Sequence, residues 1–172
     1  GLLDLVWEPN QRVSVDSTSL AIRATDSMTD VLTGYYGDDD VDLKIREMSW
    51  VEQTLLNQGL SGIWQFQGLN EAELDWGYTF SLANRYEPDH RYTSYWEDSN
   101  VNGTFNAEDQ RLAPRAYSAQ RWYTDVRDII HDGTLQLTIP IFWFGSSADF
   151  LDLGMQAVRQ DRVATTRRLS FN

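Results

Sequence analysis

Apolar and polar residues alternate over many stretches of the chain, which is the pattern of β-strands with one buried face. The clearest example is residues 75–82, whose every second residue is large and apolar: Trp76, Tyr78, Phe80 and Leu82. Similar alternation predicts further strands at residues 13–22, 41–50, 135–143 and 163–171. Short runs of apolar and aromatic residues predict three more at residues 2–7, 63–66 and 92–96. The sequence therefore predicts a mainly-β protein.

Two stretches have helical spacing instead. Trp122, Val126 and Ile129 recur at intervals of three or four residues and predict a helix from about Ser118 to His131. A second short helix is expected over residues 147–158, with the first residue as its N-cap. The predicted fold is a single domain over residues 1–172, a jelly-roll β-barrel or sandwich with one or two short helices in its connections.

Composition narrows the class of protein. The chain has 172 residues, of which 41% are hydrophobic and 13% aromatic, so we expect one domain with one good core. The absence of cysteine excludes disulfides and thiolate metal sites. Neither a signal-peptide pattern nor an apolar run near 18 residues occurs, and Gly1 fits removal of an initiator Met.

The formal net charge is −12, which argues against nucleic acid as a partner because phosphates would be repelled. The most acidic run, residues 38–42, fits either a solvated loop or a cation site, and both interpretations stay open. Arginines collect near the C-terminal end of the sequence and would suit an acidic patch on another copy or ordinary surface ion pairs: Arg159, Arg162, Arg167 and Arg168.

Residues 98–109 have the ligand spacing of an EF-hand-type calcium loop. Oxygen-bearing side chains fill the ligand positions, with Gly103 at the position of the sharp turn: Asp98, Asn100, Asn102, Asn106 and Asp109. The loop resembles those of dockerins and EF-hand proteins, which implies that Thr104 adds a backbone carbonyl. Asp109 is shorter than the usual Glu, and a strand rather than a helix precedes the loop. A structural calcium ion and a plain Asn-Gly hairpin turn both remain possible interpretations.

Catalytic signals are weak. Glu87, Asp89 and His90 form the one compact group of acids and imidazole in the sequence, but a polar turn around Pro88 explains it equally well. No nucleophile elbow, phosphate-binding glycine loop or zinc helix occurs. We therefore expect a protein that is not an enzyme, with a hydrolase based on paired acids as the third choice.

Seven tryptophans are spread along the chain at positions 7, 50, 64, 76, 96, 122 and 143. They could pack in a core or an interface, or serve as platforms on which sugar rings stack. A carbohydrate-binding β-sandwich, a class that often holds a structural calcium, is therefore the alternative function.

In length, acidic cysteine-free composition and strand layout, the whole chain resembles the small major capsid protein of tailless icosahedral viruses with an internal membrane, the single-jelly-roll viruses of Thermus and of halophilic archaea. The resemblance implies a virion protein that forms dimers and builds capsomers with itself or with a second capsid protein. It also implies contact with the internal viral membrane or a minor membrane-associated protein, after assembly in the host cytoplasm. Residues 2–7 and 163–171 would be the contact elements.

Overall fold

The computed structural model describes residues 1–38, 41–68, 71–98, 110–141 and 149–171. These residues are almost entirely in strands, so the expected mainly-β class is confirmed. The elements are β1 (Leu2–Asn10), β2 (Val13–Tyr36), β3 (Val41–Phe66), β4 (Ala72–Asp98), β5 (Arg111–Leu112), β6 (Ala119–Ile141) and β7 (Asp149–Ser170).

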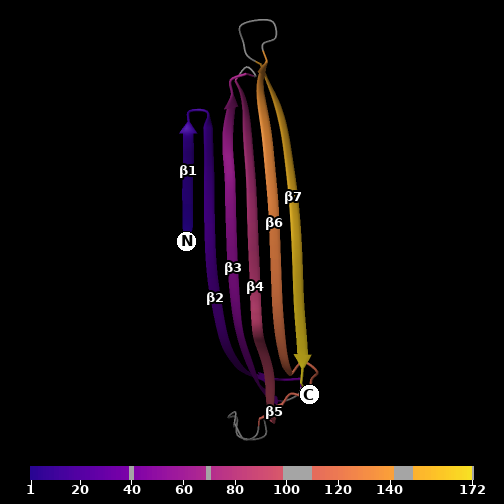
Figure 1. Ribbon diagram of the computed structural model, residues 1–172. Helices are drawn as coiled ribbons and strands as arrows, with labels where there is room; N and C mark the ends of the chain where they lie inside the picture. The colour runs from indigo at the N-terminus through magenta and orange to yellow at the C-terminus, as the bar shows by residue number, and fades with distance from the viewer. Residues whose placement is uncertain (39–40, 69–70, 99–109, 142–148, 172) are drawn as a thin grey trace. The chain divides into compact units, whose positions relative to one another are not determined.

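The strands belong to one sheet with a sequential order. β1, β2, β3, β4, β6 and β7 lie side by side in that order, and the short β5 pairs with β4 (Figure 1). β1 and β2 pair antiparallel, with Leu5 opposite Ser17 and Trp7 opposite Val15. A jelly roll has two packed sheets, whereas the described strands form a single sheet. The finer jelly-roll arrangement is therefore not seen in this part of the chain.

The two predicted helices are wrong, because β6 covers residues 119–141 and β7 covers residues 149–170. Trp122, Val126 and Ile130 are spaced by even numbers of residues, so they also satisfy a strand that presents them on one face. Gly133 follows Asp132, and an Asp-Gly pair often forms a turn, yet this glycine lies within β6. Within the described ranges, no helix is long and apolar enough to cross a bilayer.

The chain divides into two compact units, each built from parts of several strands. Unit 1 comprises residues 1–23, 54–84 and 127–163, and unit 2 comprises residues 24–53, 85–126 and 164–172. The buried hydrophobic residue described in unit 1 is Ala72, and those in unit 2 are Val41 and Ala113. The large core expected from composition is therefore not found among the described residues.

Candidate functional site

Side-chain contacts sort the residues of unit 1 onto two faces of the sheet. Gln58 of β3 donates a hydrogen bond to Ser17 of β2 at 3.0 Å and accepts one from Ser19. The next residue along β3, Asn57, contacts Ser81 of β4 at 2.6 Å on the opposite face. Because successive side chains of a strand point to opposite sides, these contacts assign every second residue to one face.

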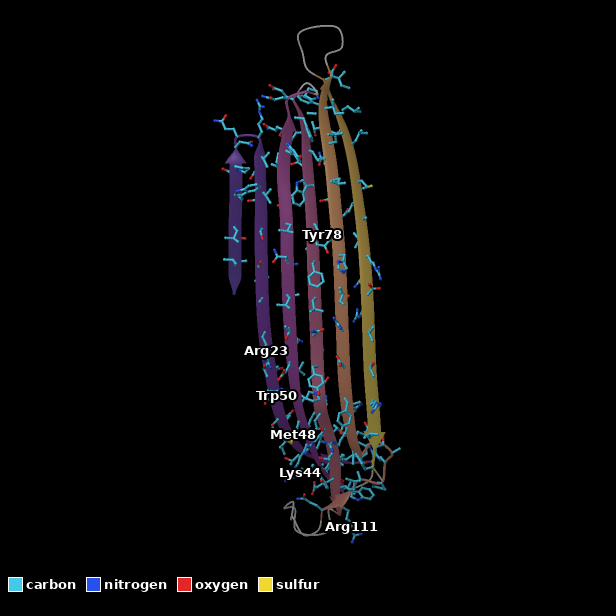
Figure 2. All side chains as sticks on the ribbon, viewed as in Figure 1. Arg23, Lys44, Met48, Trp50, Tyr78 and Arg111 are labelled. Atoms are coloured by element: carbon cyan, nitrogen blue, oxygen red, sulfur yellow. The ribbon has the colours of Figure 1, made fainter. Side chains whose placement is uncertain are left out.

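The face that contains Gln58 is called the apolar face. On β4 and β6 it is fixed by Tyr78 and His131, whose side chains form a hydrogen bond of 2.7 Å; Tyr78 projects from β4 in Figure 2. Alternation from these contacts gives its other large members: Leu3, Leu5, Trp7, Leu56, Leu60, Trp64, Leu74, Trp76, Phe80, Leu82, Ile129, Leu135, Leu137, Ile139, Leu151, Leu153 and Met155. Many are widely exposed, including Trp64 at 51% and Met155 at 64%.

The opposite face, called the polar face, carries a ladder of hydrogen bonds between strands. Between β6 and β7, Gln156 donates to Asp132 at 3.1 Å and Gln160 donates to Asp128 at 2.9 Å. Its other polar members, again by alternation, are Asp4, Asp16, Thr18, Ser61, Gln65, Glu73, Asp75, Thr79, Thr134, Gln136, Thr138 and Asp152. Large apolar residues also lie on this face, and many of them are exposed: Leu2, Val6, Leu20, Ile22, Leu55, Ile63, Ile130, Phe150 and Val158.

Glycines allow close packing on both faces. A Cβ added to Gly62, on the apolar face, would lie 2.8 Å from the carbonyl oxygen of Ser14 and from the Trp76 ring. A Cβ added to Gly77, on the polar face, would lie 2.7 Å from Oγ1 of Thr134. Both positions are therefore filled by neighbouring atoms, and a side chain at either one would displace them.

A shallow groove of about 640 Å³ crosses the polar face over β3, β4, β6 and β7. Asp75 and Asp16 are among its lining residues, with Gly77 and Gly154 forming part of its floor. Partial burial, helped by the nearby charge of Glu73, raises the pKa of the Asp75 carboxyl. The groove is lined by carboxylates and hydrogen-bonding groups together with apolar residues, Ile63 and Met155 among them.

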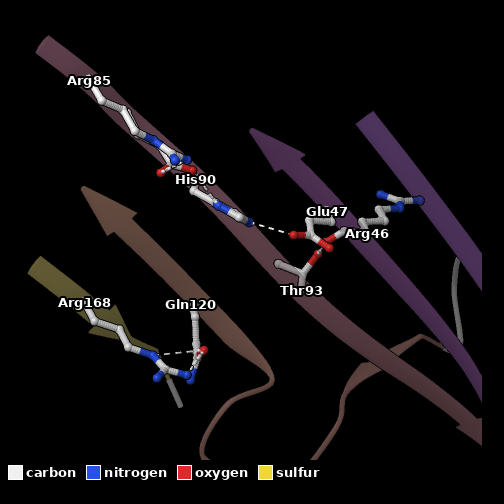
Figure 3. Close-up of polar contacts among 8 residues, drawn as sticks. Arg46, Glu47, Arg85, His90, Thr93, Gln120 and Arg168 are labelled. Carbon is white, nitrogen blue, oxygen red and sulfur yellow. Dashed lines mark hydrogen bonds and ion pairs between the residues drawn. The ribbon is translucent and has the colours of Figure 1, made fainter. Parts of the chain in front are cut away.

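In unit 2, His90 joins two carboxylates on neighbouring strands. Its Nδ1 lies 2.8 Å from Glu87 of β4, and its Nε2 lies 2.8 Å from Glu47 of β3 (Figure 3). Trp122 of β6 packs edge-on against the imidazole, with 4.7 Å between ring centroids. Glu87 is itself buried, with 8% exposure, and Arg85 lies 3.6 Å from it.

The chemistry of this cluster is that of an ion-pair network. A neutral imidazole has a single N–H, so both contacts of His90 are hydrogen bonds only when the ring or one carboxyl carries an extra proton. Within the described part of the chain, the hydrogen-bonding partners of His90 are carboxylates, and neither is a hydroxyl that could act as a nucleophile. The sequence indicated the pairing of Glu87 with His90 but missed Glu47 and Trp122, which are distant in the chain.

Asp89, the remaining acid of the predicted group, pairs with two arginines. Arg121 donates to it at 2.8 and 2.9 Å, and Arg91 donates at 2.6 Å. These hydrogen bonds, first from Arg121 and then from Arg91, lower the pKa of Asp89 to about 2. Asp89 thus links β4 to β6 and is held ionised, which makes it a poor proton donor at neutral pH.

Arg168 of β7 completes the contacts around Trp122. Its guanidinium lies 5.2 Å from the Trp122 ring centroid and donates to the buried amide of Gln120 through Nε at 3.2 Å (Figure 3). Ser118, next to this region in sequence, is fully buried, and its Oγ has no hydrogen-bonding partner within the described part of the chain. The cluster therefore ties β3, β4, β6 and β7 together through polar side chains.

Most of the predicted calcium ligands lie outside the residues that the structure describes. Asp98 is the last residue of β4, while Asn100, Asn102, Thr104, Asn106 and Asp109 lie outside the described residues. Among the residues that are described, no group of three or more His, Asp or Glu side chains is arranged to hold a metal ion. The calcium loop therefore stays a prediction.

Comparison of the sequence with known protein families and with curated proteins finds no match.

Proposed function

We propose that unit 1 spans a lipid bilayer, with the apolar face against acyl chains and the polar face towards water. The observation that carries this proposal is the unequal sorting of side chains across adjacent strands, with most of the carboxylates on one side and, on the other, an uncharged apolar stretch from Leu74 to Leu82 on β4. Within the described part of the chain the strands form a single sheet, and no second layer there covers those apolar groups. Acyl chains would cover them at a favourable free energy of about 25 cal/mol per Å² removed from water.

The length of the apolar stretches fits this role. On β4 the apolar face carries no charged side chain from Leu74 to Leu82, and on β6 it carries no acid, lysine or arginine from Ile129 to Ile139. A tilted strand needs about 9–11 residues to cross the hydrocarbon layer. Trp7 and Trp64 lie towards one end of the apolar stretches, where amphipathic rings favour the interface between lipid and water.

A sheet in hydrocarbon also needs its edges closed. β1 and β7 are the two outer strands, and each would otherwise leave backbone N–H and C=O groups without partners. In a bilayer each such group costs several kcal/mol. The proposal therefore requires further strands paired with β1 and β7.

The test uses the intrinsic tryptophans of the whole protein, reconstituted in phosphatidylcholine vesicles with and without brominated acyl chains. Trp76 lies on the apolar face, so we expect bromine to quench fluorescence and Trp76→Phe to reduce the quenched fraction. Trp122→Phe is the matched control, because Trp122 lies in the polar cluster of unit 2 and should contribute little. Absence of quenching, together with full access of a water-borne quencher to Trp76, would exclude the proposal.

A capsid role stays a second candidate, because exposed apolar groups such as Leu5 on β1 and Leu153 on β7 would also suit assembly with another chain. That role predicts a specific oligomer without lipid, which a light-scattering mass in high and low salt would detect. Carbohydrate binding is the remaining alternative. Trp64 and Phe66 stack with centroids 5.4 Å apart and an angle of 15°, and polysaccharide would then shift the tryptophan fluorescence.

A further inference from the structure

A groove of about 800 Å³ lies at one end of unit 1, where the turn between β1 and β2 is beside the end of β3 (Figure 1). Two segments line it, residues 10–13 and residues 64–68. The backbone N–H of Gln65 donates to the carbonyl oxygen of Arg12 at 2.9 Å and holds the two segments together. Small-molecule sites in proteins have volumes of about 300–1,000 Å³, so the groove is large enough for a ligand.

Two aromatic residues of β3, Trp64 and Phe66, form the floor of this groove. They are two residues apart on the strand, so their side chains lie on the same face of the sheet. The rings stack with 5.4 Å between centroids and 15° between planes. Trp64 is 51% exposed, and the antiparallel pairing of β2 with β3 puts Val13 beside it. A ligand with a flat apolar face can therefore lie on the Trp64 ring.

Primary amides are the commonest polar groups around this floor. Four of the nine lining residues carry one: Asn10, Gln11, Gln65 and Gln67. Asn10 accepts a hydrogen bond from the backbone of Arg12, and Gln65 donates one to Glu73, both at 2.9 Å. The side chains of Gln11 and Gln67 have no hydrogen bond to any residue that the structure describes. Each of these two amides therefore offers two N–H donors and a carbonyl acceptor to a ligand.

The charge of the groove argues against an ionic ligand. Among the described residues that line it, Arg12 is the one charged side chain. A metal cation needs oxygen ligands such as carboxylates, and a protein with a net charge of −12 repels phosphates. A purely apolar ligand would leave the covered amides without hydrogen-bonding partners, which is costly. The groove thus favours a neutral ligand with an apolar face and several hydroxyls.

We propose that this groove binds a β-glucopyranose ring, with one face of the sugar stacked on Trp64 and its hydroxyls bonded to the amides of Gln11 and Gln67. All hydroxyls of this sugar are equatorial, so both faces of the ring carry C–H groups and the rim carries the polar groups. A hydroxyl both donates and accepts, as an amide does, so the two kinds of group match. Arg12 adds further N–H donors beside the amides.

Sugar binding at this place is compatible with the membrane-spanning role of unit 1 and does not depend on it. The hydrogen bond between Gln65 and Glu73 places Trp64 beside Leu74, at the end of the uncharged stretch on β4. In a bilayer that end lies at the interface with water. The glucose of a glycolipid headgroup and that of a free oligosaccharide would both reach it, and they present the same ring.

The experiment titrates the whole protein in phosphocholine micelles with cellotetraose and measures binding by calorimetry. Sorbitol, which has the hydroxyls of glucose on an open chain, is the control ligand. We expect saturable binding of cellotetraose and none of sorbitol. Trp64→Ala should weaken cellotetraose binding about tenfold, because the aromatic contact is lost. Trp64→Phe should retain most of the affinity.

Trp50→Ala is the matched control, because Trp50 is a tryptophan of unit 2 with a similar exposure of 45%. Its loss should leave sugar binding unchanged. Gln67→Leu should weaken binding about fivefold, since its hydrogen bonds to the hydroxyls are lost. Circular dichroism verifies the fold of each variant.

A second titration adds a glucosyl diacylglycerol to phosphatidylcholine vesicles that contain the protein and follows the shift in tryptophan emission. Binding of cellotetraose supports the sugar site with a free oligosaccharide as its ligand, and binding of the glucosyl lipid alone supports it with a headgroup as its ligand. Binding of neither, equal binding of sorbitol, or an equal loss in Trp50→Ala would overturn the sugar site. If cellotetraose binds while brominated chains leave Trp76 unquenched, the membrane-spanning role fails and the sugar site stands.

Discussion

The phenol oxygen of Tyr78 lies 2.7 Å from Nδ1 of His131 and joins β4 to β6 on the apolar face of unit 1. The ring of Phe80 packs against the same imidazole, with 5.2 Å between centroids. Where acyl chains cover this face, as we propose, no water can replace a lost partner, so each polar group depends on the other for its hydrogen bond. Removing one leaves the other without that partner, and the cost is that of an unsatisfied polar group.

Tyr78→Phe should therefore lower the free energy of unfolding by about 1 kcal/mol. The measurement is urea unfolding in detergent micelles, followed by circular dichroism. Tyr86→Phe is the control, because Tyr86 is 50% exposed and has no hydrogen bond among those described. Equal losses in the two variants would mean that the bond to His131 contributes nothing.

Gly62→Ala should destabilise the sheet by about 1–3 kcal/mol, as overpacking does elsewhere. The added methyl group would meet the carbonyl oxygen of Ser14 and the ring of Trp76, both at 2.8 Å. Gly34→Ala is the matched control, since nothing lies within 4 Å of a Cβ at that position. A thermal midpoint that falls for Gly62→Ala and is unchanged or raised for Gly34→Ala is the expected result.

Leu135 and Gln136 are neighbours on β6 and lie on opposite faces of the sheet, so a charge placed at each one tests the two faces separately. Leu135→Arg places a charge on the apolar face and should oppose stable membrane insertion by about 2–4 kcal/mol. Gln136→Arg places the same charge on the polar face, where it meets water and carboxylates, and should be tolerated. The fraction of folded protein recovered in vesicles measures both, and similar losses would contradict the two-faced arrangement.

The ion pairs of Asp89 predict a loss of stability in acid. Hydrogen bonds from Arg121 and Arg91 lower its pKa from 3.8 to about 2 in the folded state. A lowered folded-state pKa stabilises the fold above the unfolded value, so the contribution is complete above about pH 4 and is lost as pH falls towards 2. The stability difference between the unmodified protein and Asp89→Asn should shrink over that window, and a constant difference would refute the assignment.

The calcium loop predicted at residues 98–109 can be tested without structural detail. A ligand that binds only the folded state stabilises it, and the stabilisation grows with the logarithm of the ligand concentration once that concentration exceeds the dissociation constant. Excess calcium should therefore raise the midpoint relative to chelator, and Asp98→Asn should reduce the increase. An unchanged midpoint would favour a plain turn at Asn102 and Gly103.

Local alternation predicted most of the strands but underestimated their length. It also assigned helices to two segments that are strands in the structure, β6 and β7. The spacing of Trp122 and Val126 fits a helical face and a strand face alike, so the sequence alone could not decide between them. Pairing with β4 and β7 decided it, because tertiary context overrides weak local preference. Gly133, which usually marks a turn, is accommodated within β6 beside its neighbours on β7.

The candidate site was only partly predictable. Glu87 and His90 are three residues apart and were recognised together, whereas Glu47 joins them from a different strand. The two faces of unit 1 could not be recognised from a core prediction, because the same alternation serves a buried core and a lipid-covered surface. The exposure of residues such as Met155 distinguishes an uncovered apolar surface from a buried core. Exposure can be read only from the folded sheet.

Because β2, β3 and β4 follow one another both along the chain and across the sheet, their pairings form as successive hairpins. Each new strand closes a loop little longer than a turn, and the entropy lost on closing such a loop is small. Pairings between neighbours in sequence also lower the contact order, which favours rapid folding. The sheet can therefore grow one strand at a time, with each completed edge serving as the template for the next.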